Sequence, residues 1–493
     1  MNKLKQILTG PSKDSVFLMA ARIITIILGM ATSRLLSDAL SLTEYGTYSQ
    51  IMLLVSTIAS VTILGMADGS NYFYYNNQGE KERAEYISTI FFLQYMFSFL
   101  AGSILLMISR QLTVYFGNEK IRGLLIFAAV IPLLQNMISI LQVLFIAVGK
   151  AKQIAVRNFI FSFIRLILFA AACHIIHNIT AIFIFMILMD LAQIVYFRAV
   201  LNKNHCNIGI TKINLKLIKN ILTYCIPMAV FIIVSSLSRD CDKYVISAYT
   251  DTNTLAIYSN ASKMLPFDII YSSFCTVLVP YITKYISNGL YVEAQKLYRK
   301  FLELAIMTTS ILACAAIVSA PMLLELLYTK KYMEGLWIFI VYILVDIVRV
   351  LNITIVLSAV GQAKELVMIS GISLALNFVL NIIFFKKLGI IGPALSTLLV
   401  MTLSGIVIQN KCSKVLQCKL NKLLSAKKIL FYGVKLCSVS IIFIVLSEIF
   451  SQSTIHYIIR LLIISGGFCM SMLMICGKEL IIIIKEIGNY KLN

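Results

Sequence analysis

Long uninterrupted apolar runs dominate this chain and decide what it can fold into. Two of them are FFLQYMFSFLAGSILLMI at residues 91–108 and GLWIFIVYILVDIVRVLNITIVLSAV at residues 335–360. A helix needs about 20 apolar residues to cross roughly 30 Å of hydrocarbon, and these runs are of that length. Because 59% of the residues are hydrophobic and only 13% are charged, a soluble core is excluded and the chain is expected to lie in a membrane.

The apolar runs and the polar breaks between them predict about 14 transmembrane helices. The runs are continuous and lack the alternating pattern of a membrane barrel strand, so helices are the expected spanning structure. The expected fold class is therefore all-α and polytopic. The predicted spans cover residues 14–36, 47–67, 87–109, 121–148, 153–173, 179–198, 220–239, 255–281, 301–321, 335–360, 365–385, 389–410, 429–449 and 456–477.

The basic residues lie mainly in short loops between these runs. The net charge is +21, but the lysines and arginines form neither one amphipathic face nor a tail, so no nucleic-acid partner is expected. If the N-terminal lysines are cytoplasmic, roughly 27 basic residues fall on that side and about ten on the other. This bias predicts a multi-pass protein of the inner or plasma membrane with both termini cytoplasmic. One cytoplasmic loop, between spans 4 and 5, contributes Lys150, Lys152 and Arg157.

Three local patterns carry less information. The opening MNKLKQILTGPSK leads directly into a full-length apolar span, so no cleavable signal peptide is expected. The eleven cysteines form no CxxC pair, and HIIH at residues 174–177 has no third ligand nearby, so no metal or other cofactor is expected. The run RDCD at residues 239–242 resembles the DxD of sugar-transferring enzymes. A nucleotide sugar would not be available at the outer end of span 7, which favours a helix-end polar cluster there.

The chain also contains an internal repeat. AVGKAK at residues 147–152 is echoed by AVGQAK at residues 359–364, and RGLLIFAAVI at residues 122–131 by EGLWIFIVYI at residues 334–343. Both pairs lie 212 residues apart without a gap. We therefore predict two copies of a six-span unit, inserted in the same orientation and related by an axis along the membrane normal, with a cavity between two bundles. In both echoed turns, glycine is expected to end a helix.

The repeat gives the predicted domain organisation. It comprises an N-terminal six-helix bundle, a basic cytoplasmic linker, a C-terminal six-helix bundle, a basic cytoplasmic loop, and two extra transmembrane helices with a cytoplasmic tail. These parts cover residues 1–202, 203–219, 220–410, 411–428 and 429–493, respectively.

Charged residues inside spans are the candidate site residues. A charge near the bilayer centre costs at least about 2.5–3.5 kcal/mol, so it usually faces a cavity or a partner. The candidate cavity cations are Arg22 in span 1, Lys263 in span 8 and Arg349 in span 10. Cations outnumber acids across the spans, which favours an anionic cargo. The residues that could line the cavity or couple transport to an ion are Arg165, Asp190, Asp268 and Asp346.

Each candidate also has a structural interpretation. Arg22 could snorkel or pair with another helix. Asp268 could neutralise Lys263, and Pro266 between them is expected to loosen the helix and free backbone carbonyls. Asp346 and Arg349 share a helix face at i, i+3 and could pair with each other. Arg165 and Asp190 could likewise pair.

The exit of the first span, AARIITIILGMATSRLLSDALSLTEYGTYSQ at residues 20–50, is similar to the opening of the Wzx-like oligosaccharide flippases. These belong to the polysaccharide transporter family of the multidrug/oligosaccharidyl-lipid/polysaccharide exporter superfamily. RDCDKYVISAYTDTNTLAIYSNASKM at residues 239–264 resembles the matching exit of the second half. The resemblance covers spans 1–12, and its motifs identify the superfamily more securely than the cargo.

This resemblance implies two six-helix bundles that alternate between inward-open and outward-open states. The implied cargo is an oligosaccharide on undecaprenyl pyrophosphate, turned to the outer leaflet for polysaccharide assembly. A polysaccharide polymerase and glycosyltransferases are implied partners. Arg22 matches the cavity arginine of the family, and Lys263 stands where related lipid II flippases carry cations in span 8. A lysine there lacks the bidentate grip that arginine has on pyrophosphate.

Other functions remain open at this point. A cation-coupled multidrug exporter or a lipid II flippase would share the architecture. Drug exporters tend to use membrane-embedded carboxylates, whereas span 1 carries Arg22 and no acid between Ser15 and Ser33. A membrane-embedded polymerase or glycosyltransferase would need catalytic carboxylates and usually a large outer loop, and no outer loop of that size is predicted. The chain is therefore expected to be a transporter and not an enzyme.

Overall fold

The computed structural model describes residues 11–77, 79–203, 209, 212–451 and 456–488, and every element in them is a helix. Within these residues, eleven helical stretches are long and apolar enough to cross a membrane, so the chain is an all-α multi-pass membrane protein. Residues 364–415 count as one stretch, although they contain two long helices of 26 and 24 residues. The number of fourteen spans stays a prediction. The predictions for Lys3 and Lys5, for linker residues 204–208 and 210–211, and for residues 489–493 lie outside the described residues.

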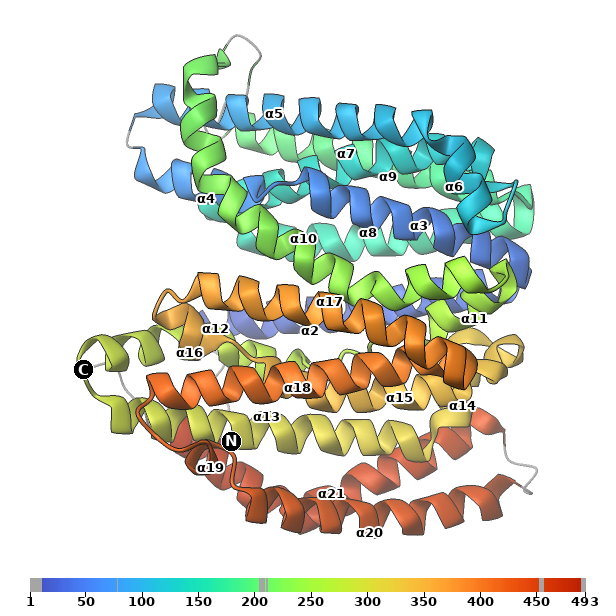
Figure 1. Cartoon of the computed structure of the whole chain (residues 1–493), viewed down its shortest axis with the longest axis vertical. Coiled ribbons are helices and arrows are strands. Elements are labelled where there is room, and N and C mark those ends of the chain that lie inside the picture. The colour runs from blue at the N-terminus through green and yellow to red at the C-terminus, as the bar shows by residue number, and fades with distance from the viewer. Residues whose placement is uncertain (1–10, 78, 204–208, 210–211, 452–455, 489–493) are drawn as a thin grey trace. The chain divides into compact units, whose positions relative to one another are not determined.

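The chain divides into two compact units, and unit 1 holds residues 1–243 and 247–256. Its long apolar helices pack around α7, which contacts α3, α4, α5 and α9, while α2 packs along α8 (Figure 1). Fully buried side chains of α5 and α7, among them Ile90, Leu141 and Phe145, form its core. The elements are α2 (Pro11–Ala39), α3 (Leu42–Thr62), α4 (Met66–Asn76), α5 (Glu80–Met107), α6 (Ser109–Phe116), α7 (Ile121–Ala147), α8 (Ala151–Ala171), η1 (Ala172–Ile176), α9 (Ile179–Lys203), η3 (Leu215–Leu217) and α10 (Ile218–Tyr249).

Unit 2 holds residues 244–246 and 257–493. Here α13 is the central helix and contacts α12, α15, α20 and α21, while α17 and α18 pack side by side (Figure 1). The elements are α11 (Thr252–Ala261, whose first half groups with unit 1), α12 (Ile269–Ser287), α13 (Tyr291–Val318), α14 (Ala320–Tyr328), η4 (Lys330–Gly335), α15 (Leu336–Val348), η5 (Arg349–Asn352), α16 (Ile355–Ala359), α17 (Ala363–Leu388), η6 (Gly389–Ile391), α18 (Gly392–Val415), α19 (Leu420–Leu423), α20 (Ala426–Ser451) and α21 (Tyr457–Gly488).

The helix bounds follow the repeat offset read from the sequence. α5 and α13 both contain 28 residues and end at Met107 and Val318, 211 positions apart. α8 and α17 begin at Ala151 and Ala363, 212 positions apart. A short helix follows both 28-residue helices, as α6 and as α14. Corresponding elements therefore recur in the same order in the two halves of the chain.

The two echoed turns have the same backbone geometry. Gly149 and Gly361 have φ angles of 76° and 70°, in the left-handed region that glycine adopts without a steric penalty. The amide of Lys150 donates to the carbonyl of Phe145 at 2.9 Å, and the amide of Gln362 donates to that of Leu357 at 3.0 Å. These six-to-one bonds are the closing bonds of a Schellman motif. The prediction that both glycines end a helix is confirmed.

Two predicted spans are interrupted in unit 2. Span 8 is divided into α11 and α12 by an irregular segment, residues 262–268, that contains Pro266. The break agrees with the effect predicted for this proline. Span 10, which the sequence predicts as one helix over residues 335–360, is divided into α15, η5 and α16, with residues 353 and 354 outside any helix. No proline or glycine lies at this second break.

The last two helices, α20 and α21, pack against α13 and against each other. The hydroxyl of Tyr432 on α20 donates to the carbonyl of Met307 on α13 at 3.1 Å. Both helices have the length and hydropathy of membrane spans. They add to unit 2 a part that has no counterpart in the first copy of the repeat.

Candidate functional site

Asp346 joins the two interrupted spans of unit 2. It lies near the end of α15, and its Oδ2 atom accepts a hydrogen bond from the backbone amide of Leu265 at 2.9 Å. Leu265 belongs to the irregular segment between α11 and α12, where the amide is free of helical bonding. Side-chain partners of this kind are what allow non-helical backbone at membrane depth. The two breaks therefore meet at one buried carboxylate, which is 2% exposed.

Arg349 lies between two carboxylates at this meeting point. Its guanidinium is 3.3 Å from Asp268 Oδ2 and 3.5 Å from Asp346 Oδ1. It also donates to the Tyr271 hydroxyl and lies 2.9 Å from the sulfur of Met264. The pairing of Asp346 with Arg349 expected from their spacing is present, and Asp268 has Arg349 as a partner. We call this cluster of one cation and two carboxylates the break site (Asp268, Asp346, Arg349). Asp268 lies at the end of the first break, and Asp346 lies just before the second.

The backbone of the second break is held by side chains of other helices. Gln409 on α18 donates to the carbonyl of Leu351 at 2.8 Å, and Asn352 donates to that of Met401 at 2.9 Å. The Tyr298 hydroxyl on α13 lies 3.3 Å from the carbonyl oxygen of Ile353. Lipid cannot form hydrogen bonds with peptide groups or polar side chains, and these contacts supply the missing partners. The second break is therefore stabilised by the surrounding helices.

Lys263 lies in the other break, directly after α11. Its ammonium group is 5.4 Å from the centre of the Tyr328 ring on α14, a cation–π distance. The side chain is half-buried. The structure thus gathers Lys263, Asp268, Asp346 and Arg349 in the interrupted region of unit 2, and their roles in transport stay predictions.

Arg22 and Arg165 lie in unit 1 on two helices that pack together, α2 and α8. Both side chains are exposed. Arg22 makes no hydrogen bond or ion pair with any other residue in the described part of the chain. Arg165 acts electrostatically on Asp190, although the two form no ion pair within 4 Å among the described residues.

A buried polar cluster surrounds Asp190, between α7, α8 and α9. Gln193 donates to Asp190 Oδ1 at 3.2 Å and accepts a hydrogen bond from Arg157, which also donates to Gln142 at 3.2 Å. The Arg157 guanidinium stacks on the Phe197 ring at 4.7 Å. We call these residues the Asp190 cluster.

Arg157 was missed by sequence reasoning, which counts it among the cytoplasmic loop cations. The structure places it inside α8 and 8% exposed, so that interpretation was wrong. Its nearness to Lys150 and Lys152 hid it, and the glutamines that hold it lie 15 and 36 residues away. The apolar residues on both sides of Arg157 in the sequence were the available sign that it lies within a span.

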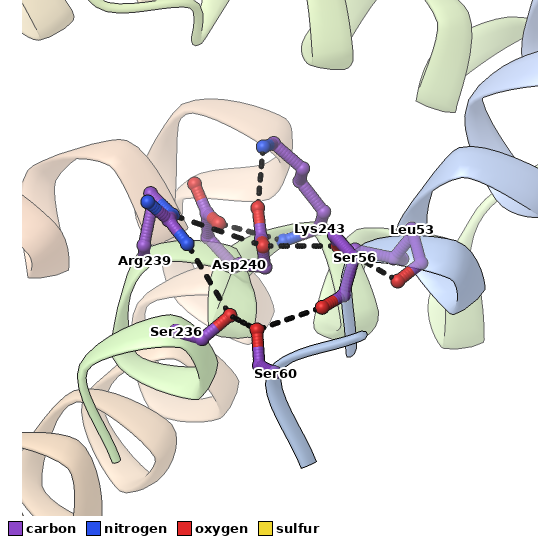
Figure 2. Close-up of polar contacts among 8 residues, drawn as sticks. Leu53, Ser56, Ser60, Ser236, Arg239, Asp240 and Lys243 are labelled. Atoms are coloured by element: carbon purple, nitrogen blue, oxygen red, sulfur yellow. Dashed lines mark hydrogen bonds and ion pairs between the residues drawn. The ribbon is translucent and has the colours of Figure 1, made fainter. Parts of the chain in front are cut away.

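The RDCD run lies within α10, which continues to Tyr249, so the prediction of a helix end at this run was wrong. The run contacts α3 (Figure 2). Asp240 accepts from Lys243 at 2.7 Å, and the Ser56 hydroxyl lies 3.4 Å from Asp240 Oδ2. One turn earlier on α10, Ser236 accepts from Ser60 at 2.6 Å. Small hydroxyl side chains on both helices permit this close approach. These contacts make the run part of a polar contact between two helices. No group of three metal-ligating side chains occurs among the described residues.

Comparisons with known proteins identify a sequence family and a shared fold. The model of a family described as "Polysaccharide biosynthesis protein" matches residues 32–336, more than half of the chain. An inward-facing multidrug resistance MATE family transporter of the MOP superfamily has a similar structure, with a TM-score of 0.64 and 11% identity over 83% of this chain and 97% of the other. No curated protein sequence matches the chain significantly.

Two further solved structures share the architecture. A MATE transporter of Vibrio cholerae aligns with a TM-score of 0.55 and 14% identity, over 82% of this chain and 96% of the other. A MOP superfamily transporter from Pyrococcus furiosus, described by the reverse polarity of its binding pocket, aligns with a TM-score of 0.54 and 12% identity, over 82% and 94%. At such low identity these similarities show the fold alone.

Proposed function

Because the chain belongs to the polysaccharide biosynthesis protein family, we propose that it is a membrane transporter of the MOP superfamily, not an enzyme, and that it flips lipid-linked oligosaccharides. The cargo is an oligosaccharide repeat unit on undecaprenyl pyrophosphate. It moves from the cytoplasmic to the outer leaflet of the inner or plasma membrane by alternating access. Glycosyltransferases supply the cargo on one side, and a polysaccharide polymerase consumes it on the other.

The observation that carries the proposal is the family match over residues 32–336. A pyrophosphate group carries about two negative charges through a medium in which charge is costly. Arg22 is exposed on an apolar helix and has no ion-pair partner among the described residues. A fixed guanidinium of this kind offsets the cost of the phosphate charge and can grip two of its oxygens.

The break site supplies a second cation, Arg349, which differs from Arg22 in having carboxylate partners. Arg349 is about a quarter exposed and already paired with Asp268 and Asp346. A phosphate that binds Arg349 has to compete with these carboxylates. Arg349 therefore binds cargo only when its ion pairs with Asp268 and Asp346 are broken. Lys263 lies in the neighbouring break and extends the basic character of this region. Arg165 and Asp190 of unit 1 stay predictions as cavity or coupling residues, and the enclosed contacts of Asp190 favour a structural role for it.

A cation-coupled multidrug exporter is the second candidate, because the solved structures with this fold include multidrug transporters. The fold is equally compatible with a lipid II flippase. Drug exporters tend to rely on carboxylates that are free to bind a cation. Here both acids of the break site contact Arg349, which favours an anionic cargo.

The test is complementation of a strain that lacks its own polysaccharide flippase, with membrane protein level measured in parallel. We expect Arg22→Glu to abolish surface glycan, Arg22→Ala to reduce it at least about tenfold, and Arg22→Lys to retain part of it, since only lysine keeps a positive charge. Arg110→Ala is the matched control, because Arg110 is an exposed arginine on α6 of the same unit. Full glycan output from a stably inserted Arg22→Glu variant would contradict the proposal.

A further inference from the structure

A cavity of about 410 Å³ lies among α13, α19, α20 and α21, away from the break site. Ile306 and Met307 of α13, Tyr432 of α20 and Ile483 of α21 form its apolar wall. The volume is within the range of about 300–1,000 Å³ that is usual for small-molecule sites. Two of the helices that form it, α20 and α21, are the spans predicted outside the repeat. The two predicted six-helix bundles alone would therefore not form this cavity.

The mouth of this cavity opens to lipid. Phe431 and Ile482 line it and are 63% and 54% exposed, and both belong to helices with the length and hydropathy of membrane spans. Large apolar side chains exposed on a membrane span face hydrocarbon. Any molecule that fills the cavity therefore reaches it from the bilayer and can keep an apolar part there.

The cavity also has a basic rim, formed by Lys300, Lys428 and Lys435. Glu303 accepts contacts from three cations, Arg299 at 3.0 Å, Lys428 at 3.1 Å and Lys300 at 3.7 Å. One carboxylate cannot neutralise three positive charges. The rim is therefore attractive to an anion.

Two further carboxylates do not remove this excess. Glu486 contacts Lys300 at 2.7 Å, and Glu479 contacts Lys435 at 3.5 Å. Three lysines and two glutamates line the cavity, and Arg299 and Glu486, which lie beyond its lining, leave the excess at one positive charge. Lys435 also lies 4.6 Å from the Phe431 ring, so an ammonium group stands directly beside the apolar part of the mouth. Long lysine side chains arranged in this way place their charge at the edge of the membrane and their stems along lipid.

We propose that this cavity, the lysine-rimmed pocket, binds an anionic glycerophospholipid of the surrounding bilayer. The phosphate lies among Lys300, Lys428 and Lys435, and an acyl chain leaves past Phe431 and Ile482. Basic pockets between transmembrane helices are a known kind of site for anionic headgroups. The occupant is a resident lipid of the membrane and not the flipped cargo. The proposal is therefore independent of the proposed function.

The experiment measures lipid retained by the purified full-length chain in native mass spectrometry. The probes are phosphatidylglycerol and phosphatidylcholine, which differ in headgroup charge. We expect Lys428→Gln with Lys435→Gln to lose phosphatidylglycerol at least about fivefold, and the matched control Lys422→Gln with Lys427→Gln to retain it. Lys422 and Lys427 lie in the same basic segment but do not line the pocket. Lys428→Arg with Lys435→Arg keeps the charge and should retain the lipid.

Measurements on the unaltered chain distinguish the sources of phosphate and do not depend on how the variants fold. We expect phosphatidylglycerol to raise the thermal midpoint, an effect that weakens as salt rises from about 0.1 to about 0.5 M. Glycerol 3-phosphate, which lacks acyl chains, should not displace the lipid. Equal retention of both phospholipids, equal retention in both double variants, or displacement of phosphatidylglycerol by a lower concentration of undecaprenyl phosphate would each overturn the proposal.

Discussion

The two units each hold a buried acid and an arginine, but in different backbone settings. The Asp190 cluster lies between α7, α8 and α9, and its groups project from helices that are continuous there. The break site lies where two spans are interrupted. Both of its acids contact Arg349, and Asp346 also accepts a hydrogen bond from the backbone amide of Leu265. Interrupted helices supply polar backbone groups at membrane depth, which is where transporters place binding sites.

Exposure reinforces the contrast. Arg157 and Asp190 are buried, and so is Asp346 of the break site, whereas Arg349 and Asp268 are partly exposed. Two members of the break site are thus partly accessible, whereas the charged groups of the Asp190 cluster are enclosed. The comparison teaches that a charge within a span is a weak sign of function by itself. A charge at a break, with partial exposure, is a stronger one.

The largest expected effect is at Arg349. Arg349→Ala leaves Asp268 and Asp346 without their shared cation, which we expect to abolish glycan output and to lower the free energy of unfolding by about 3 kcal/mol. Arg349→Lys should recover stability better than transport, because lysine cannot contact both carboxylates through a planar fork. Glycan output is measured in the complemented strain, and stability by thermal unfolding in detergent. Normal glycan output from Arg349→Ala would remove the break site from transport.

The next effect is at Arg157, where stability and transport should separate. Arg157→Leu removes the hydrogen bonds to Gln142 and Gln193, so we expect a loss of about 2–3 kcal/mol. Glycan output per folded molecule should stay near normal, since this cluster is enclosed by continuous helices. Adding Asp190→Leu should recover part of the lost stability, because no carboxylate then remains buried without its arginine network. If folded Arg157→Leu transports poorly, the contrast between the two units fails.

Much of the helical framework could be predicted from the sequence. The apolar runs located the helices, Pro266 located the first break, and Gly149 and Gly361 marked equivalent helix ends. These features depend on residues close together in the chain. Hydropathy and turn chemistry are therefore sufficient to reveal them.

The second break could not be predicted in this way. Residues 349–354 contain no proline or glycine, and their carbonyls are held by Gln409 and Tyr298, which lie 58 and 55 positions away. Tertiary contacts override a local preference for helix here. The same holds for Arg157, whose burial depends on glutamines of two other helices. The sequence thus placed Lys263 and Asp268 beside the break at Pro266, but it did not reveal that Asp346 and Arg349 lie at a second break.

The smallest expected effect tests how closely the second break is packed. A Cβ atom at Gly405 of α18 would lie 2.6 Å from Cβ of Leu351, whereas one at Gly371 of α17 would meet no atom within 4 Å. We expect Gly405→Ala to lower the free energy of unfolding by about 1–3 kcal/mol by forcing α18 away from the break. Gly371→Ala should be neutral or stabilise the helix by up to about 1 kcal/mol. Thermal unfolding of the two variants gives the difference directly. Equal midpoints would mean that α18 yields without strain, and the break would then not depend on close packing at Gly405.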